Sequence, residues 1–326
     1  MSEEAKLNIG CIAVGSHAER NILPAINSSS KFNLFGIHRR DKIKGKKISE
    51  EYNCKFYETV DDLLLEDNIN AVYISSPTAL HDIEIKKAIS AGKNVLVEKS
   101  SFYNHHQCLK VCENAISANL VIMEAFMYRF HNQFKELRKI IDQKIYGQIL
   151  NFKSIFGFPH LDHSNFRYSN ELGGGALLDA GAYAISSALE IIGSEPIIRY
   201  SSIGNSKKYK VDTYGVAILE SGNQEENFFG FCNWYFGGPY TNEILITFSE
   251  AQVCFKRVFS KPENHSSKIE VYKNDALLES IIIEPHNHFL SMLDYFYKTI
   301  NEDKYEFEIS KTIMQSKLLN DIKLNK

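Results

Sequence analysis

"LNIGCIAVGSHAERNILPAI", residues Leu7–Ile26, joins an apolar run to a helical segment through a turn of small residues. The apolar run has the length and composition of a buried strand. A dinucleotide-binding fold needs small residues at such a turn, because its backbone approaches a pyrophosphate held at the amino terminus of the helix. Here the pattern is AxGxxA, formed by Ala13, Gly15 and Ala18, and the first glycine of the usual pattern is missing. The turn fits a cofactor site, and taken alone it also fits a tight turn without a ligand.

Short apolar runs alternate with polar helical segments through the first third of the chain: "LNIGCIAV", "FNLFGIH", "NAVYIS", "NVLVEK" and "LVIMEAF". Buried strands alternating with helices predict βαβ units and a parallel sheet. From about Pro196 the pattern changes to strands of period two, and two helical segments begin near His286 and Ile309. We therefore predict an α/β Rossmann domain with a doubly wound parallel sheet over residues 1–124. An α+β domain with a large, mostly antiparallel open sheet is expected over residues 125–326.

The end of the second predicted strand is basic. NAD-preferring folds commonly place an acid there to bind the ribose 2′-hydroxyl, whereas this chain has His38, Arg39 and Arg40. Two guanidinium groups can bind a 2′-phosphate and stack on adenine, and an acid would repel that phosphate. The sequence therefore predicts NADP(H). The alternative is a solvated basic loop, and we assign Lys42–Lys47 to such a loop.

Composition limits the class of protein. Of the 326 residues 44% are hydrophobic and 24% charged, which is typical of a globular protein, and the net charge of −3 argues against nucleic-acid binding. No apolar run approaches the roughly 20 residues that span a bilayer, and "MSEEAKLNIG" lacks the pattern of a secretory signal. The six cysteines form no CxxC pair, which favours a reducing compartment. We expect a cytoplasmic protein that binds neither nucleic acid nor membrane.

Further motifs put polar residues where open α/β sheets bind ligands. They are "YISSPTALH" (Tyr73–His81) and "VLVEKS" (Val95–Ser100), followed by "MEAFMYRFHNQ" (Met123–Gln133) and "FRYSNELGGGALLDAGAYAI" (Phe166–Ile185). In this order, together with the amino-terminal turn, they resemble the glucose-fructose oxidoreductase/inositol dehydrogenase (Gfo/Idh/MocA) family over nearly the whole chain. The resemblance implies an NADP-dependent oxidoreductase that acts on CH–OH groups.

The resemblance also implies roles for individual residues. "EKS" matches the family's Glu-Lys-Pro motif, so Lys99 would reach both the nicotinamide ribose and the substrate oxygen, and Ser100 departs from the usual proline. Phe166 and Arg167 match an aromatic-arginine pair near the cofactor. The residues expected to bind the cofactor are Ala13, Gly15, Ser16, His17, Ala18, Arg39, Arg40, Ser75, Ser76, Pro77, His81, Glu98, Lys99, Phe166 and Arg167.

Asp179 and Tyr183 are four residues apart in a predicted helix, so they share one face. Three glycines before them would let the chain come close to ligand and cofactor. From the spacing alone, Asp179 could equally cap the helix and Tyr183 could pack between domains. With Lys99 supplied by the resemblance, we expect Tyr183 to donate a proton to the carbonyl oxygen that NADPH reduces. Lys99 would favour the phenolate, because a free phenol has a pKa of about 10, and Asp179 would orient substrate or Lys99.

The family's tyrosine-containing members include sugar 3-ketoreductases and dihydrodiol dehydrogenases, and "YTNEILITFSEAQVCFKRVFSKP" (Tyr240–Pro262) is similar to the former. This favours a nucleotide-linked keto-deoxysugar as substrate. A dehydrogenase of a free sugar or dihydrodiol, and a non-catalytic NADP-binding sensor, remain alternatives. Family members commonly pair subunits through the large sheet, so we expect a homodimer at least. The histidine groups lack the spacing of a metal site, and the expected substrate-binding residues are Lys99, Asp162, Asp179, Tyr183 and Tyr240.

Overall fold

The computed structural model describes residues 5–193, 195–206, 208–222, 226–302 and 305–325. The chain divides into two units. The first is Met1–Ala125 with Phe289–Ser316, and the second is Phe126–His288 with Lys317–Lys326. The segment Phe289–Ser316, which the sequence places in the second domain, is thus grouped with the first unit. We describe each unit by itself.

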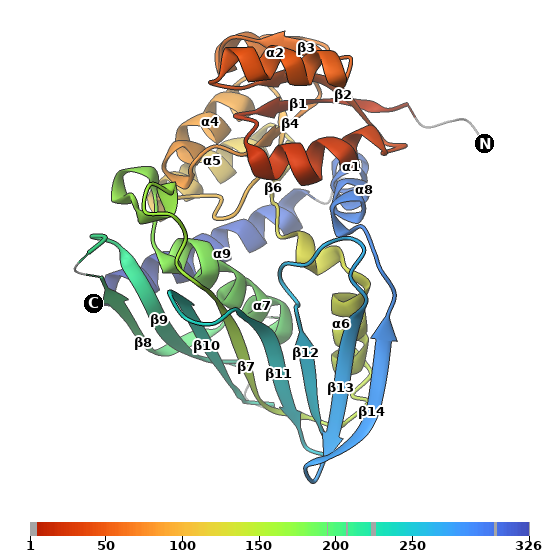
Figure 1. Cartoon of the computed structure of the whole chain (residues 1–326), viewed down its shortest axis with the longest axis vertical. Helices are drawn as coiled ribbons and strands as arrows, with labels where there is room; N and C mark the ends of the chain where they lie inside the picture. The colour runs from red at the N-terminus through yellow and green to blue at the C-terminus, as the bar shows by residue number, and fades with distance from the viewer. Residues whose placement is uncertain (1–4, 194, 207, 223–225, 303–304, 326) are drawn as a thin grey trace. The chain divides into compact units, whose positions relative to one another are not determined.

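A six-stranded parallel sheet forms the first unit, with strand order β3-β2-β1-β4-β5-β6 (Figure 1). The predicted Rossmann sheet is confirmed. Its order reverses between β1 and β4, and open sheets of this kind bind ligands at the carboxyl ends of the strands beside such a reversal. The strands are β1 (Leu7–Ile12), β2 (Phe32–His38), β3 (Lys55–Tyr57), β4 (Ala71–Ile74), β5 (Asn94–Val97) and β6 (Ile122–Glu124).

Both faces of this sheet are covered, which explains the unbroken apolar runs. Ile12, Val72, Val95 and Ile122 are completely buried, as expected where helices flank a parallel sheet. The expected solvated loop at Lys42–Lys47 is wrong, because these residues form the first turns of a helix. The helices are η1 (Ala18–Ile22), α1 (Leu23–Asn27), α2 (Lys42–Glu51), α3 (Val60–Leu64), α4 (Thr78–Ser90), α5 (His105–Ser117), α8 (His288–Asn301) and α9 (Tyr305–Leu324), whose last turns belong to the second unit.

The carboxyl-terminal segment of the first unit packs against its amino-terminal half. The ring of Phe296 on α8 stacks on Phe32 of β2 with centroids 5.9 Å apart, and Tyr297 meets the same ring edge-on. On α9, Ile309 is completely buried in the cluster that includes Val97. Both closing helices were predicted, and their apolar faces complete the core of the first unit.

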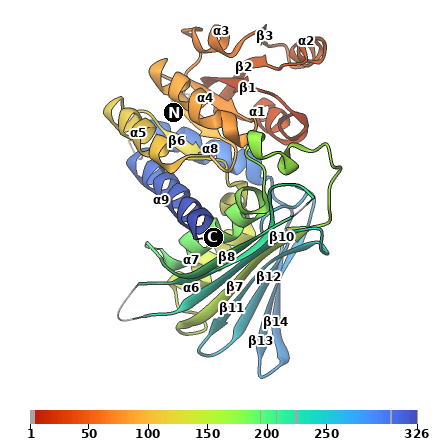
Figure 2. The ribbon, with the colours of Figure 1, turned by 90° about the vertical axis from the view of Figure 1, so that its left-hand side faces the viewer.

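An eight-stranded sheet dominates the second unit, with order β14-β13-β12-β11-β7-β10-β9-β8. All neighbouring strands are antiparallel except β7 and β10, which run parallel in the middle. Helices α6 and α7 contact one face, and no helix of the described part of this unit covers the other (Figure 2). The elements are η2 (Met127–Phe130), α6 (Asn132–Asp142), β7 (Ile149–Phe158), η3 (Phe166–Tyr168), η4 (Asn170–Leu172), η5 (Leu177–Gly181), α7 (Ala182–Ile192), β8 (Ile197–Asn205), β9 (Asp212–Glu220), β10 (Phe229–Phe236), β11 (Thr241–Phe248), β12 (Gln252–Lys256), β13 (Ser267–Lys273) and β14 (Ala276–Ile283).

The predicted helix around Asp179 and Tyr183 begins differently from an ordinary α-helix. Leu177–Gly181 form a turn of π-helix, η5, and the α-helical pattern starts at Ala182. Such wide turns are rare and occur frequently at functional sites. The stretch Asn170–Ile192 is long and apolar enough to cross a membrane by length and composition, and 78% of its most apolar part is buried inside the molecule, as in a core helix.

Candidate active site

The turn after β1 leaves space above its glycine. A Cβ atom at Gly15 would meet only the carbonyl oxygen of Ala13, at 3.9 Å. The backbone N–H of Val14 donates to the carbonyl of His38 at 3.0 Å, and the hydroxyl of Ser75 donates to the carbonyl of Ala13 at 3.1 Å. The turn is therefore fixed between the ends of β2 and β4. Since packing within the unit does not require a glycine here, the open backbone fits the close approach of a pyrophosphate.

Two arginines follow β2, and they have different environments. Nη1 of Arg39 lies 3.1 Å from Oε2 of Glu19, an ion pair that ties the end of β2 to the start of the first helix. Arg40 is exposed. Burial lowers the pKa of the neighbouring His38, whose Nδ1 lies 3.4 Å from the backbone N–H of Ala13. Arg39 is thus held at the turn, while Arg40 carries an exposed guanidinium.

Glu98, at the end of β5, is the centre of a small polar network. The hydroxyl of Tyr73 donates to its carboxylate at 2.6 Å, and Nε2 of His17 lies 3.5 Å from the same oxygen. Burial acts to raise the pKa of Glu98, but His17, Tyr73 and the charge of Lys99 outweigh it and keep the pKa below its ordinary value. The carboxylate is therefore ionised, beside the turn residue His17 and the lysine expected to be catalytic. The sequence had not indicated Tyr73.

His81 joins the ends of β4 and β5. Its Nε2 lies 2.8 Å from the carbonyl oxygen of Ser76 and its Nδ1 lies 2.9 Å from that of Ser100, and burial lowers its pKa. The peptide bond between Lys99 and Ser100 is cis. The hydroxyl of Ser76 in turn donates to Glu84. The first unit thus brings together Gly15, Ser16, His17, Ala18, Ser75, Ser76, Pro77, His81, Glu98 and Lys99 around the carboxyl ends of β1, β4 and β5.

Two of the three glycines of the second unit, Gly174 and Gly175, lie so close to neighbouring parts of the protein that a side chain would not fit. Gly173 and Gly175 have positive φ angles of 76° and 115°. A Cβ at Gly174 would lie 2.4 Å from the carbonyl oxygen of Arg167, and one at Gly175 would lie 2.1 Å from Oδ1 of Asp212. Asp212 also accepts a hydrogen bond from the backbone N–H of Leu177, at 2.6 Å. Asp212, which the sequence did not indicate, therefore satisfies a donor at the helix start where Asp179 was one candidate cap.

Asp179 is paired with an arginine. Nε of Arg167 donates to Oδ2 of Asp179 at 2.6 Å, and only 13% of the Asp179 side chain is exposed. The guanidinium of Arg167 also lies over the ring of Phe166, with Cζ 4.8 Å from the centroid. Two residues expected at the cofactor and one expected at the substrate are therefore one connected group.

Tyr183 lies in an aromatic cluster. Its ring centroid is 5.2 Å from that of Phe156, 5.5 Å from that of Phe126 and 5.6 Å from that of Phe259. Its hydroxyl lies 3.6 Å from the sulfur of Met127, and 6% of the residue is exposed. The surrounding rings fix the position of the phenol, as a proton donor in a reaction requires.

The other two residues expected to bind substrate, Asp162 and Tyr240, also belong to the second unit. Asp162 is exposed and accepts hydrogen bonds from the backbone and hydroxyl of Ser164, which lower its pKa. Tyr240 is 46% exposed, and its ring meets Phe156 edge-on at 6.3 Å. Within the described ranges, no three histidine, cysteine or acidic side chains are arranged to hold a metal ion.

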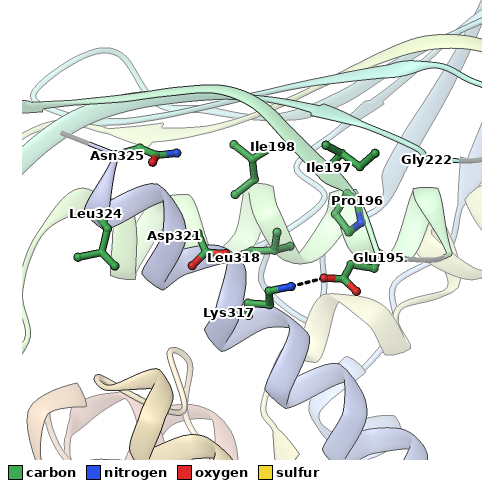
Figure 3. Close-up of a pocket in the computed structure, with 10 residues that line it drawn as sticks. All are labelled: Glu195, Pro196, Ile197, Ile198, Gly222, Lys317, Leu318, Asp321, Leu324 and Asn325. Carbon is green, nitrogen blue, oxygen red and sulfur yellow. Dashed lines mark hydrogen bonds and ion pairs between the residues drawn. The ribbon is translucent and has the colours of Figure 1, made fainter.

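A pocket of about 680 Å³ opens between the last turns of α9 and the start of β8 (Figure 3). Its apolar wall includes Ile198 and Leu318, and Lys317 forms an ion pair with Glu195 at one side. All its lining residues belong to the second unit, and none is a residue expected in the active site. We therefore do not assign the predicted chemistry to this pocket.

Two family models match the chain. The model described as an oxidoreductase family with an NAD-binding Rossmann fold matches residues 7–126, and the GFO/IDH/MocA C-terminal domain matches residues 134–254. Together they cover well over half of the chain. The chain belongs to the Gfo/Idh/MocA oxidoreductase family. The predicted resemblance is confirmed, and with it the division into a parallel and a mostly antiparallel sheet.

Individual members of the family match over different lengths. The dTDP-3,4-didehydro-2,6-dideoxy-alpha-D-glucose 3-reductase of Actinomadura kijaniata is 26% identical over 97% of this chain and 94% of its own length. The trans-1,2-dihydrobenzene-1,2-diol dehydrogenase of Xenopus laevis is 29% identical over 61% of this chain and 59% of its own. Among crystal structures, a 3-ketoreductase from Actinomadura kijaniata in complex with NADP and TDP-benzene superimposes with a TM-score of 0.92, at 24% identity and 98% coverage of both chains. Forms of that ketoreductase with one lysine or one tyrosine replaced have also been crystallised.

The two units of this Gfo/Idh/MocA member carry different parts of the expected site. Lys99 and most cofactor residues lie in the first unit, whereas Phe166, Arg167, Asp179 and Tyr183 lie in the second. The pairing of Lys99 with Tyr183 would join residues of different units and stays a prediction, as do the roles of the individual residues.

Proposed function

We propose that this chain is an NADP(H)-dependent ketoreductase that reduces the carbonyl of a nucleotide-linked keto-deoxysugar. The observation that carries the proposal is the match to the dTDP-keto-deoxysugar 3-reductase over nearly the full length of both chains. A second observation supports it. The lysine and the tyrosine replaced in the crystallised ketoreductase are the same number of positions apart as Lys99 and Tyr183.

The first unit fits NADP(H). The open backbone at Gly15 suits the pyrophosphate, and the guanidinium of Arg40, with Arg39 beside it, suits the 2′-phosphate. When bound, NADPH supplies the hydride. Glu98, after β5, contacts His17 after β1 and Tyr73 of β4, so these residues would position the nicotinamide half of the cofactor.

In the second unit, Tyr183 would donate its phenolic proton to the carbonyl oxygen, which completes the alcohol as hydride reaches the carbon. Lys99 would stabilise the phenolate that forms, because a nearby ammonium favours the charged state. Asp179 accepts a hydrogen bond from Arg167 through Oδ2, which fixes the carboxylate for contact with the substrate hydroxyl or Lys99.

The decisive experiment has two assays. The first measures NADPH oxidation with a dTDP-linked 3-keto-deoxysugar and with the corresponding free keto-sugar. The second measures NADP⁺ reduction with xylose, as a free sugar, and with a dihydrodiol. We expect turnover with the nucleotide-linked ketone. Turnover with only the free sugar or the dihydrodiol would favour the dehydrogenase alternative, which the dihydrodiol dehydrogenase match supports. Binding of NADPH without turnover of any of these compounds would favour a sensor.

We further propose that the protein is cytoplasmic and forms homodimers through the face of the large sheet opposite α6 and α7. On β10 the side chains alternate, and Phe229, Phe231 and Tyr235 lie on the face opposite the buried Cys232 and Trp234. Sedimentation equilibrium tests the dimer, and a monomeric mass at micromolar concentration would contradict it.

A further inference from the structure

An arginine stacks on a tyrosine ring at one end of the large sheet. Cζ of Arg257, just after β12, lies 5.5 Å from the ring centroid of Tyr240, just before β11. Both side chains are exposed. A guanidinium that stacks on an aromatic face keeps its N–H groups directed outward in its own plane, where they can bind an anion in bidentate fashion. The sequence analysis did not single out Arg257.

Asn242 holds this arrangement in place through its hydrogen bonds. Its side-chain amide donates to the hydroxyl of Tyr240 at 2.9 Å and to the carbonyl of Ser260 at 3.1 Å, and its Oδ1 accepts from the backbone N–H of Phe259 at 2.9 Å. Its own carbonyl accepts from the backbone N–H of Arg257 at 2.6 Å. Asn242 is 5% exposed. The tyrosine and the arginine backbone are thus held before any ligand arrives, which reduces the entropy lost on binding.

Arg257 and Lys261 both lie near His265. Nζ of Lys261 lies 2.5 Å from Oε1 of Gln133 and burial lowers the pKa of Lys261 to about 7, and the charges of Arg257 and Lys261 add to burial in lowering the pKa of His265. Over the residues that the structure describes, no carboxylate forms an ion pair with Arg257. An anionic ligand would therefore meet an uncompensated cation on a fixed support.

Two aromatic rings, those of Tyr240 and Phe156, connect this cation to Tyr183. The ring centroid of Phe156 lies 6.3 Å from that of Tyr240 and 5.2 Å from that of Tyr183. In a nucleotide-linked sugar the diphosphate is attached directly to the sugar ring. With a carbonyl of that ring placed at Tyr183, the diphosphate would lie beyond the sugar ring, free to extend past Phe156 and Tyr240 towards Arg257.

We infer that Arg257, supported by Tyr240 and Asn242, binds the diphosphate of the substrate and so selects nucleotide-linked over free sugars. This inference rests on the proposed ketoreductase function. Arg257 would contribute charge-assisted hydrogen bonds that a free sugar cannot accept, so its loss should affect one substrate class only.

The test measures binding of dTDP by calorimetry in the presence of saturating NADP⁺. Arg257→Ala should weaken dTDP binding by about 10- to 100-fold, because hydrogen bonds to a charged group are lost. Arg257→Lys keeps the charge but not the fork, and should lie between Arg257→Ala and the wild type. Lys273→Ala removes one positive charge at the far end of β13 and serves as the matched control, with unchanged binding.

Two results would overturn the inference, and they differ in what they leave standing. If the wild type binds dTDP and Arg257→Ala binds it equally well, the diphosphate site is elsewhere and the proposed function is untouched. If the wild type binds no dTDP, both the diphosphate site and the nucleotide-linked substrate class fail, and NADPH oxidation with free keto-sugars then shows whether the reductase activity survives. Thermal melting of both Arg257 variants checks that they are folded.

Discussion

Replacing Tyr183 with phenylalanine should separate chemistry from stability. The ring keeps its contacts with Phe156 and Phe126, at 5.2 and 5.5 Å, because phenylalanine has the same ring. The hydroxyl loses a 3.6 Å contact with the sulfur of Met127, a weak acceptor. We therefore expect the free energy of unfolding to change by less than about 1 kcal/mol. Turnover should fall by roughly 100-fold or more, the range for loss of a general acid.

Tyr128→Phe is the matched control. Tyr128 is completely buried beside Tyr183, and its hydroxyl lies 2.9 Å from Oγ of Ser186, so phenylalanine leaves a buried serine without this partner. This variant should lose about 1–2 kcal/mol of stability and keep its activity. The assay is steady-state NADPH oxidation with a dTDP-keto-sugar, combined with urea unfolding. Full activity of Tyr183→Phe, or an equal loss of activity in both variants, would refute the assignment of the proton donor.

Three further predictions concern other parts of the molecule. Arg40→Ala should weaken NADPH binding at least about tenfold without changing NADH binding, as measured by fluorescence titration, and equal effects on both cofactors would contradict the role of Arg40 at the 2′-phosphate. Gly174→Ala places a Cβ 2.4 Å from the carbonyl of Arg167 and should lower stability by about 1–3 kcal/mol in thermal or urea unfolding, whereas unchanged stability would show that this loop adapts. Burial lowers the pKa of His131 from 6.5 to about 3, so this histidine binds a proton at a lower pH in the folded protein than in the unfolded chain. The free energy of unfolding should therefore fall as pH drops from 6.5 towards 3. His131→Asn retains an N-cap acceptor for α6 and should flatten that part of the pH–stability curve, and an unchanged slope would assign it to other groups.

The sequence predicted the first sheet well because its strands are continuous apolar runs, a pattern that burial on both faces produces. It missed β3, which has only three residues, and β7, where polar and apolar residues alternate around Phe152 and Phe156. Polar and apolar residues alternate over part of β7, but because it contains Asn151, Lys153 and Ser154 it lacks the continuous apolar run that predicted the strands of the first sheet. Strand β7 nevertheless lies in the middle of the second sheet, where a single parallel pairing surrounds it with antiparallel neighbours.

At the candidate site, motifs identified residues but not their partners. The spacing of Asp179 and Tyr183 indicated a shared helix face, yet nothing in "GGGALLDAG" shows the π-helical turn or the hydrogen bond from Arg167. The stack of Arg257 on Tyr240 depends on the antiparallel register of β11 and β12, which sets Glu243 opposite Lys256. Such contacts depend on pairing between distant segments, which local sequence patterns do not encode.

The assignment of Phe289–Ser316 to the first unit has a consequence for how this enzyme is made. A ribosome that has reached Ala125 has synthesised every strand of the nucleotide-binding sheet, but Phe32 still lacks the ring of Phe296 and the core lacks Ile309. The first unit cannot be completed until the chain as far as Ser316 has emerged. A fragment that stops after the sixth strand would expose this apolar surface, so an excised cofactor-binding module needs the two distant helices fused back to it.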